Sequence, residues 1–433
     1  MESPDKQAVR SSQYQVICVC AACGFPFSGN AKRITNVGNA LQEAGIGFRV
    51  LHCGPSPAPL DTRRSGVYRG IRFEYTTSLR RPANLFLRLP VYFRALAGLT
   101  LRLSRLGPAR KKTAVYLFVM EGPLVLYTGL LCRLLRIPLV QEMNEWFPAC
   151  RDSKILHWLY RKPIFSMATG LLAISKSIQA RVQEAAKTAN PRLLIHYLPL
   201  IVDSERFSAA PGIEAREPLP VFLWCGIGYT RDLRFLIRVL GRVHRLGYRC
   251  RLRVITAAYL EWGPPAMLEY AEKQGLPPQA IDITGCVDDR ALETYYKTAT
   301  AHLLPLWDDE QSRMRMPNKL AEYLASGRPV ITGGIGDLLN FLSDGVNAYI
   351  GKPGSEEDFV SNMISVLRDP ARAAVIGAAG QTTCLQRLDY RFQVESLSRF
   401  FIQCIDCRNS ETAAVSERPR DAEAVVHPPA GEN

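Results

Sequence analysis

The side chains best placed for chemistry lie in one short segment, residues 317–330. It opens on Pro317 and stops at Gly327, which suits the first turn of a helix and the position just past its end. Lys319 and Glu322 fall three residues apart and share one face of that helix. Backbone N–H groups at a helix start attract anions, so a polar face beginning there predicts an anion-binding element.

Glycine-containing loops precede two other expected helices. Gly29 follows the first apolar run, and Gly226 and Gly228 follow the apolar residues 220–225. Glycine lets a backbone approach a ligand closely, although an ordinary turn between strand and helix would use it as well. Arg231 stands at the start of the next helix, where a guanidinium can clamp a phosphate with two N–H groups. A solvated surface arginine is the alternative.

An acidic loop, Asp308, Asp309 and Glu310, comes directly after an apolar run at residues 301–306. Carboxylates in such a loop can meet sugar hydroxyls or act as a general base. The alternative is a solvated acidic loop. We carry Glu310 forward as a candidate catalytic carboxylate.

Apolar runs alternate with helix-like stretches along most of the chain. Runs of this kind are typical of parallel strands buried on both faces, and the alternation predicts α/β architecture. The pattern restarts after residues 211–220, which contain three prolines and a glycine. We therefore predict two doubly wound, Rossmann-like domains that face a cleft. Expected strands cover residues 14–22, 48–53, 71–75, 114–119, 138–142, 170–174, 194–198, 220–225, 251–256, 281–284, 301–306, 329–332 and 348–350.

The expected organisation has six parts. A flexible tail covers residues 1–13, and an N-terminal domain facing an acceptor and a membrane covers 14–210. A linker at 211–219 leads to a C-terminal ligand-binding domain at 220–390. A helix at 391–407 packs back towards the N-terminal domain, and residues 408–433 form a disordered tail rich in Ser, Glu, Pro and Ala.

Positive charge is concentrated in the first half of the chain. The net charge is +14, with 54 Lys+Arg against 40 Asp+Glu. Residues 79–112 carry nine basic residues and no acidic one, interleaved with leucines and aromatics. This pattern is typical of a basic amphipathic segment at a membrane surface, where anionic lipid attracts each Lys or Arg by about 1 kcal/mol. The candidate membrane or acceptor residues are Arg80, Arg81, Arg88, Arg94, Arg102 and Arg105.

The basic segment has two alternative interpretations besides membrane contact. A helix hairpin packed on the sheet with a solvated basic face would show the same composition. Nucleic-acid binding is not favoured, because no binding motif accompanies the charge. The first residues show no apolar signal segment, no run is long and apolar enough to span a bilayer, and the 12 cysteines form no disulfide framework. We expect a cytoplasmic protein, peripheral on the inner face of the membrane.

Taken together, residues 14–403 resemble the retaining glycosyltransferases of family 4 (group 1), which have the GT-B fold. The strongest part is the run 317–330, followed by Gly336 and the run 343–348. It is similar to the family's donor-binding signature, Glu-Ala-Met-Ala-x-Gly-x-Pro-Val and then Gly, Asp-Gly and Asn-Gly. Residues 199–203, shortly before Phe207, look like its interdomain segment, and Ser28-Gly29 looks like its N-terminal glycine loop.

The resemblance implies roles for the residues named above. Glu322 matches the second glutamate of a paired motif, which binds the donor ribose. Arg231 matches a basic residue that holds the diphosphate, with Lys319 beside it, and the backbone of Asn318 and Leu320 faces the same group. Gly29, Gly226 and Gly228 belong to the donor site. The partners implied are a nucleotide-diphosphate sugar and a lipid-linked or glycan acceptor in polysaccharide or glycolipid biosynthesis, with no metal or other cofactor.

The match to the paired motif is incomplete. Met314 stands eight positions before Glu322, where the first glutamate belongs, and Glu310 could replace it only in a remodelled loop. Transfer of a hexosyl unit with retention is the function the resemblance implies. Two alternatives are a nucleotide-sugar epimerase of the same architecture and a non-catalytic scaffold that keeps the fold.

Overall fold

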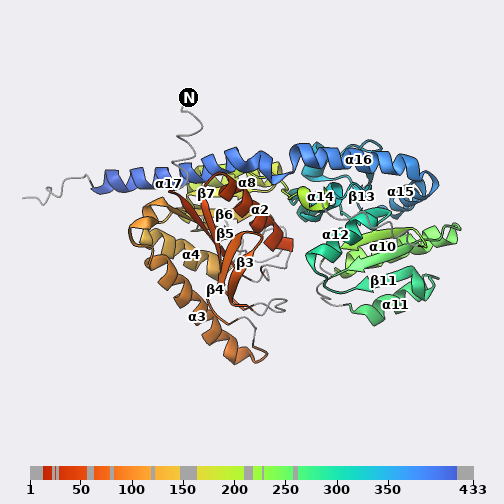
Figure 1. The fold of residues 1–433 in the computed structure, drawn as a ribbon, viewed down its shortest axis with the longest axis horizontal. Helices are drawn as coiled ribbons and strands as arrows, with labels where there is room; N and C mark the ends of the chain where they lie inside the picture. Colours follow the sequence, from red (N-terminus) through yellow and green to blue (C-terminus); the bar gives the residue numbers. More distant parts are fainter. Residues whose placement is uncertain are drawn as a thin grey trace, which may run out of the picture.

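The structure, a computed structural model, describes residues 13–21, 25, 29–55, 63–78, 82–118, 122–146, 163–208, 218–226, 229–256 and 262–416. Figure 1 shows two lobes side by side, with the C-terminal helix running back over the N-terminal lobe. Each lobe is built on one sheet with helices on both faces.

The N-terminal domain has an eight-stranded sheet in the order β3-β4-β2-β1-β5-β6-β7-β8. All pairs are parallel except β3 with β4, which is antiparallel. Its central strands are buried on both faces, which explains their continuous apolar sequences. The strands are β1 (Gln15–Cys20), β2 (Gly47–His52), β3 (Ser65–Tyr68), β4 (Ile71–Tyr75), β5 (Thr113–Phe118), β6 (Leu139–Met143), β7 (Gly170–Ala173) and β8 (Leu194–Tyr197).

Helices cover the two faces of this sheet unequally. One face packs against α2 (Gly29–Glu43) together with the C-terminal helix. The other face packs against α3 (Leu85–Ser104), α4 (Gly122–Leu135), α7 (Pro163–Met167) and α8 (Lys176–Ala189). Two further short helices are described in this domain, η1 (Gly107–Lys112) and α9 (Glu205–Ser208).

The C-terminal domain has a six-stranded parallel sheet in the order β11-β10-β9-β12-β13-β14. Its strands are β9 (Val221–Cys225), β10 (Arg251–Ile255), β11 (Ile281–Thr284), β12 (Ala301–Leu304), β13 (Val330–Gly333) and β14 (Tyr349–Gly351). The helices are α10 (Thr230–Arg245), α11 (Pro264–Lys273), η2 (Pro278–Ala280), α12 (Asp289–Thr298), α13 (Glu310–Met314), α14 (Lys319–Ala325), η3 (Gly336–Asn340), α15 (Glu356–Arg368) and α16 (Pro370–Arg387).

The chain then returns to the N-terminal domain through η4 (Tyr390–Gln393) and α17 (Val394–Ser416). Leu397, Phe401 and Ile405 of α17 are fully buried against the first sheet, and the ring of Phe401 meets that of Tyr116 edge-on at 6.0 Å. The core of the N-terminal domain therefore contains residues from both ends of the chain.

Three expectations about elements need correction. Strand β3 was not expected, because its four residues are half exposed and show little apolar character. Helix α14 starts at Lys319 with Asn318 as its N-cap, so Pro317 lies just before the helix rather than in its first turn. The tail does not begin at Arg408, because α17 continues to Ser416 and the Asn409 amide donates to the Lys111 carbonyl at 2.8 Å. Among the described helices, none is long and apolar enough to cross a membrane.

Candidate functional site

A pocket of about 270 Å³ lies where the two domains face each other. The N-terminal domain contributes Asn30 at the start of α2 and the residues after β6. The C-terminal domain contributes the loops after β9 and β12 and the start of α14. This is the carboxyl edge of both sheets, where open α/β folds bind ligands. The polar residues lining it are Asn30, Asn144, Glu145, Tyr229, Asp232, Arg315, Asn318 and Lys319.

The start of α14 brings a lysine into this pocket and places a carboxylate next to that lysine, outside the pocket lining. Lys319 Nζ lies 3.2 Å from Glu322 Oε2 and 3.2 Å from the Tyr296 hydroxyl. The Tyr296 hydroxyl donates to the same carboxylate oxygen at 3.3 Å. Gly327, with φ of +74°, ends the helix in the left-handed region that glycine tolerates best.

Burial and charge oppose each other at Glu322. Burial alone would raise the pKa of this carboxyl group, but Lys319, Lys32 and Arg206 outweigh it and lower the pKa well below its usual value. Lys319 is the converse case: burial would lower its pKa, and the nearby Cys225 and Glu322 raise it instead. Both groups are therefore charged at neutral pH.

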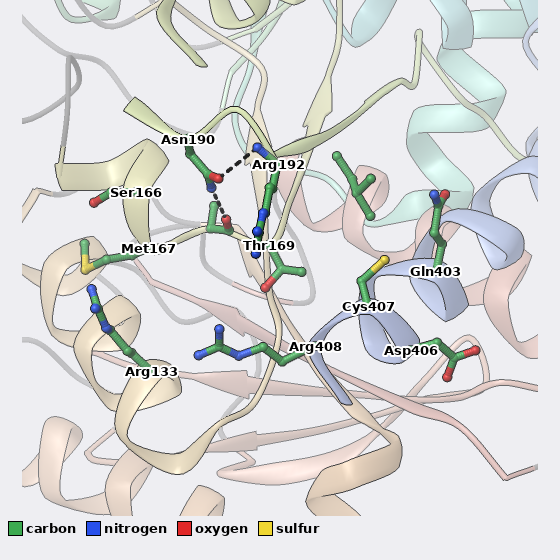
Figure 2. Close-up of a pocket in the computed structure, with 12 residues that line it drawn as sticks. Arg133, Ser166, Met167, Thr169, Asn190, Arg192, Gln403, Asp406, Cys407 and Arg408 are labelled. Carbon is green, nitrogen blue, oxygen red and sulfur yellow. Dashed lines mark hydrogen bonds between the residues drawn. The ribbon is translucent and has the colours of Figure 1, made fainter. Parts of the chain in front are cut away.

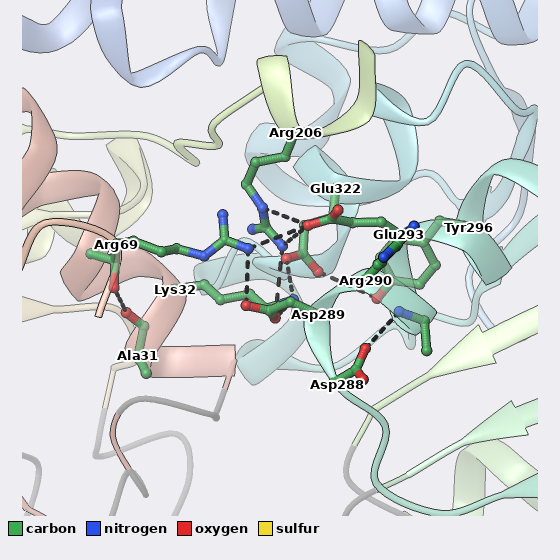
Figure 3. Close-up of polar contacts among 12 residues, drawn as sticks. Ala31, Lys32, Arg69, Arg206, Asp288, Asp289, Arg290, Glu293, Tyr296 and Glu322 are labelled. Carbon is green, nitrogen blue, oxygen red and sulfur yellow. Dashed lines mark hydrogen bonds and ion pairs between the residues drawn. The ribbon is translucent and has the colours of Figure 1, made fainter. Parts of the chain in front are cut away.

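The Glu322 carboxylate is also reached from the other domain. Lys32 of α2 places Nζ 2.9 Å from Glu322 Oε1 and 3.6 Å from Asp289 Oδ1. Figure 3 shows this lysine extending from the N-terminal domain to the acidic residues of α12 and α14. Burial lowers the pKa of Lys32, and the charge of Glu322 opposes that effect only in part.

Further ion pairs cross between the domains around α12. Arg69 Nη2 lies 2.9 Å from Asp289 Oδ2, and Arg206 Nη2 lies 2.5 Å from Glu293 Oε1. The Tyr68 hydroxyl also donates to Asp289. We call the set Lys32, Tyr68, Arg69, Arg206, Asp289, Glu293 and Glu322 the interdomain clasp. Figure 3 shows its members other than Tyr68.

A second line of contacts joins α8 to the C-terminal domain. The Ser175 hydroxyl, at the N-cap of α8, donates to the Met314 carbonyl at 2.5 Å. Asp337 accepts from the backbone N–H of Lys176. The Gln311 amide donates to Glu145 at 3.1 Å. Met314 therefore contributes its backbone carbonyl to the contact with Ser175, and its side chain is buried.

The sequence of the C-terminal domain matches a known family. Residues 220–369 match the family model described as glycosyl transferases group 1. This match contains the Lys319–Glu322 pair and the loops that line the pocket. A comparison with curated proteins finds no significant match.

Solved structures share the fold of nearly the whole chain. Sucrose-phosphate synthase from Thermosynechococcus elongatus superposes with a TM-score of 0.68 at 15% identity, covering 92% of this chain and all of the other. A glycosyltransferase from Rickettsia africae gives 0.66 at 12% identity, covering 90% and 98%. Anabaena HepE in complex with UDP-glucose gives 0.63 at 14% identity, covering 90% and 99%. The expected GT-B architecture, two Rossmann-like domains, is confirmed.

Two candidate catalytic residues of the C-terminal domain lie beside the pocket without lining it. Arg231, in the first turn of α10, is half exposed; its Nη1 lies 3.0 Å from Asp309 Oδ2 and its guanidinium stacks on Trp307 at 4.3 Å. Glu310, the first residue of α13, is half exposed and its Oε1 lies 3.3 Å from Arg181 Nη2. Only Lys319 of the three predicted catalytic residues lines the pocket.

The predicted donor-binding residues are divided in the same way. Gly226 and Asn318 line the pocket. Gly29 begins α2, next to the lining residue Asn30, and Gly228 falls outside the described residues. The Leu320 N–H donates to the Pro317 carbonyl at 3.0 Å and the side chain is fully buried, so this residue supports the turn.

The predicted membrane residues that the structure describes lie on α3 or directly after it. Arg80 and Arg81 fall outside the described residues, whereas Arg94 and Arg105 are exposed. The Arg88 Nε donates to the Pro82 carbonyl at 3.0 Å. Arg102 forms an ion pair with Glu74 of β4, so its guanidinium contacts the sheet. Exposed apolar side chains accompany them, with Phe86 87% and Phe93 62% exposed.

A larger cavity, of about 820 Å³, lies behind the N-terminal sheet at the amino ends of β7 and β8. Figure 2 shows Arg133, Arg192 and Arg408 around it, with Asn190 donating to the Ala168 carbonyl at 2.9 Å. It is on the edge of the sheet away from the cleft. Its charged residues come from surface positions on α4, the turn before β8 and α17. None of the polar residues described in its lining is buried, so the cavity offers no buried polar group to recognise a ligand.

Sequence reasoning missed the contribution of the N-terminal domain to Glu322. Lys32 lies in the first turn of the helix that follows the Gly29 loop, which was the available signal. Asp289 follows Asp288, whose carboxylate caps α12 by accepting from the Ala291 N–H at 2.8 Å. Nothing in the sequence pattern showed that Lys32 and Asp289 would meet, because their pairing depends on how the two domains face each other.

Proposed function

We propose that this protein is a retaining glycosyltransferase. In this proposal it moves a hexosyl unit from a nucleotide-diphosphate sugar to a lipid-linked or glycan acceptor at the cytoplasmic face of a membrane. The observation that carries the proposal is the Lys319–Glu322 pair at the interdomain pocket, inside the part of the chain that matches group 1 glycosyltransferases. Structural neighbours with UDP and UDP-glucose bound support a nucleotide-sugar donor.

The donor would bind with its ribose at Glu322 and its diphosphate at the start of α14. Glu322 keeps its charge under burial, which suits a carboxylate that accepts hydrogen bonds from ribose hydroxyls. Lys319 lines the pocket and supplies a positive charge where the diphosphate departs. A fixed cation is worth most in a site that excludes water, because it opposes charge that develops in the transition state.

Arg231 would complete this positive site by leaving Asp309. Its present partner is half exposed, and exposed ion pairs of this kind are worth roughly 0–1 kcal/mol, so a diphosphate can compete for the guanidinium. Glu310 occupies a comparable surface pair with Arg181. In this proposal Glu310 is a catalytic carboxylate near the transferred sugar.

Donor binding and transfer test the proposal directly. Purified protein is titrated with UDP, GDP and their hexose conjugates by calorimetry, and the product anomer is read by NMR. We expect one nucleotide to bind, the anomeric configuration to be retained and activity to persist in EDTA. Lys319→Met should lower kcat by about 100-fold, the loss seen when one transition-state charge partner is removed.

A matched control separates this effect from a general loss of surface charge. Lys273→Met removes an exposed lysine whose partner, Glu269, lies four residues earlier on α11 at 2.6 Å. It should leave kcat unchanged. If no nucleotide binds, or if Lys319→Met turns over as fast as the wild type, the proposal fails.

Helix α3 supports the membrane half of the proposal. Its buried face is Ala95, Leu99 and Leu103, yet Phe86 and Phe93 remain exposed on the other side. Arg94 lies beside them. Apolar side chains flanked by arginines are the composition of helices that lie in a bilayer interface. In this arrangement the acceptor would enter the cleft from the lipid surface.

A non-catalytic scaffold is the second candidate. Met314 stands where the family's first glutamate belongs, and its buried side chain leaves the donor sugar without that partner. Transfer or hydrolysis of a donor by the purified protein would exclude the scaffold, whereas nucleotide binding without either reaction would favour it.

A further inference from the structure

Lys32 and Glu322 form an ion pair that crosses the cleft and is shielded from solvent. The side chains are 13% and 8% exposed, and Nζ lies 2.9 Å from Oε1. Lys32 Nζ and Glu322 Oε1 are close enough for a hydrogen bond but are not well aligned for one, so the contact is chiefly one of charge. Glu322 Oε1 could then accept a hydrogen bond from a hydroxyl if Lys32 moved away.

The surrounding charges favour release of Lys32. Lys319 also lies on the Glu322 carboxylate, at 3.2 Å from Oε2. Arg206 repels Lys32 and attracts Glu322. Glu322 would thus remain paired with Lys319 if Lys32 moved away. Lys32 would keep Asp289, whose Oδ1 is 3.6 Å from Nζ.

Lys32 also limits the room for a donor. The pocket of about 270 Å³ is lined by Lys319 and Asn318 but not by Glu322, whose carboxylate is in contact with Lys32. Sites for drug-sized ligands commonly measure about 300–1,000 Å³. A nucleotide whose ribose contacts Glu322 needs the space that Lys32 occupies.

We propose that Lys32 is a donor-affinity residue: it holds Glu322 in the nucleotide-free protein and must give up this carboxylate when the ribose of a nucleotide binds. This inference rests on the proposed function, because it assumes that Glu322 receives the ribose. Apparent affinity is reduced by the fraction of molecules that are competent to bind. Lys32 therefore sets the donor Kd through Glu322, and we class it as a positioning residue.

Paired ligands separate this role from a direct contact with phosphate. UDP is compared with 2′,3′-dideoxy-UDP, which lacks both ribose hydroxyls, against wild type, Lys32→Met and Lys32→Arg. For Lys32→Met we expect the Kd of UDP to fall by about tenfold, equivalent to about 1.4 kcal/mol, and the Kd of the dideoxy analogue to stay unchanged. Lys32→Arg keeps the charge and should stay close to wild type. Lys273→Met serves as the exposed control.

Weaker binding of both ligands to Lys32→Met would make Lys32 a phosphate contact and overturn the inference. An equal fall in the Kd of UDP and of 2′,3′-dideoxy-UDP would also overturn the inference, because the gain in affinity would then not depend on the ribose hydroxyls. GDP and ADP are titrated in the same way. If no nucleotide binds, both the proposed function and the release of Glu322 by Lys32 are overturned.

The pairing itself has a test that needs no nucleotide. In the wild type, Lys32 should react slowly with an amine-labelling reagent, as followed by mass spectrometry of its peptide. Glu322→Gln should make it react several-fold faster, while Lys273 reacts equally in both proteins. Equal labelling of Lys32 in both proteins would show that the pair does not form in solution.

Discussion

Glu322 is a buried carboxylate whose charge is maintained by cations from two domains. Lys319 comes from its own helix, and Lys32 comes from the other domain. Removing one partner of a buried pair typically costs about 3–5 kcal/mol, because the remaining charge is left in a poor environment. A neutral amide of the same shape is therefore a gentler probe at this position than alanine.

Acid should reveal the contribution of Glu322 to stability. Its folded pKa is lowered from the ordinary 4.5, so the stabilisation is complete above that value and is lost as the pH falls towards the lowered pKa. Glu322→Gln has no such proton to bind. We expect the gap in urea midpoint between wild type and Glu322→Gln to be largest near pH 7 and to shrink below about pH 4.5. A gap independent of pH would mean that the carboxylate is not paired in solution.

Helix α3 shows how one element can serve both a core and a surface. Ala95, Leu99 and Leu103 repeat every four residues and pack on the sheet, which a helix of period 3.6 permits. The exposed phenylalanines break the usual polar outer face. Their exposure has a physical use if a lipid surface covers them.

Vesicle binding tests that surface. Phe86→Ser with Phe93→Ser should lower binding to anionic vesicles by at least tenfold, because burying one such side chain is worth about 1.5–3 kcal/mol. Phe392→Ser, which changes a phenylalanine 59% exposed on η4, is the matched control and should bind as the wild type does. Co-sedimentation gives the readout. Equal binding by all proteins would place the membrane contact elsewhere.

Elements with strong local signals were predictable. Every expected strand corresponds to a strand of the structure to within two residues at each end, because continuous apolar runs reflect burial on both faces. Strand β3 was missed because it lies at the sheet edge and one face is solvated. The end of α17 was placed too early, because the polar residues after Arg408 have the composition of a tail. The contact of Asn409 with Lys111, which fixes the start of this stretch, joins segments far apart in the sequence.

At the scale of the whole molecule, part of the positive charge of the N-terminal domain is paired with acidic residues of the C-terminal domain. The basic surplus of the N-terminal half predicted an anionic partner, and the clasp shows one inside the molecule. Lys32, Arg69 and Arg206 meet the acids of α12 and α14 across the cleft. The sequence contained these residues, but their pairing depends on the relative placement of two domains, which no local pattern encodes. Lys319 and Glu322 were found because they share one helix.

Loosening the clasp should change the dimensions of the protein. Arg69→Gln with Arg206→Gln removes the ion pairs to Asp289 and Glu293 while leaving Lys32 in place. Motion between domains is the default unless their interface is large and apolar. We expect a larger radius of gyration in small-angle scattering without nucleotide. Arg242→Gln, whose pairs lie within the C-terminal domain, should leave it unchanged.

Helix α17 has a consequence for synthesis on the ribosome. The nascent chain completes eight strands of the first sheet long before the helix that covers one of its faces exists. The C-terminal domain is translated in between, which takes on the order of ten seconds or more at roughly 5–20 residues per second. During that interval Tyr116 and its apolar neighbours lack their cover. The first domain to be translated is thus the last to be finished, and a chaperone has its longest opportunity at this face.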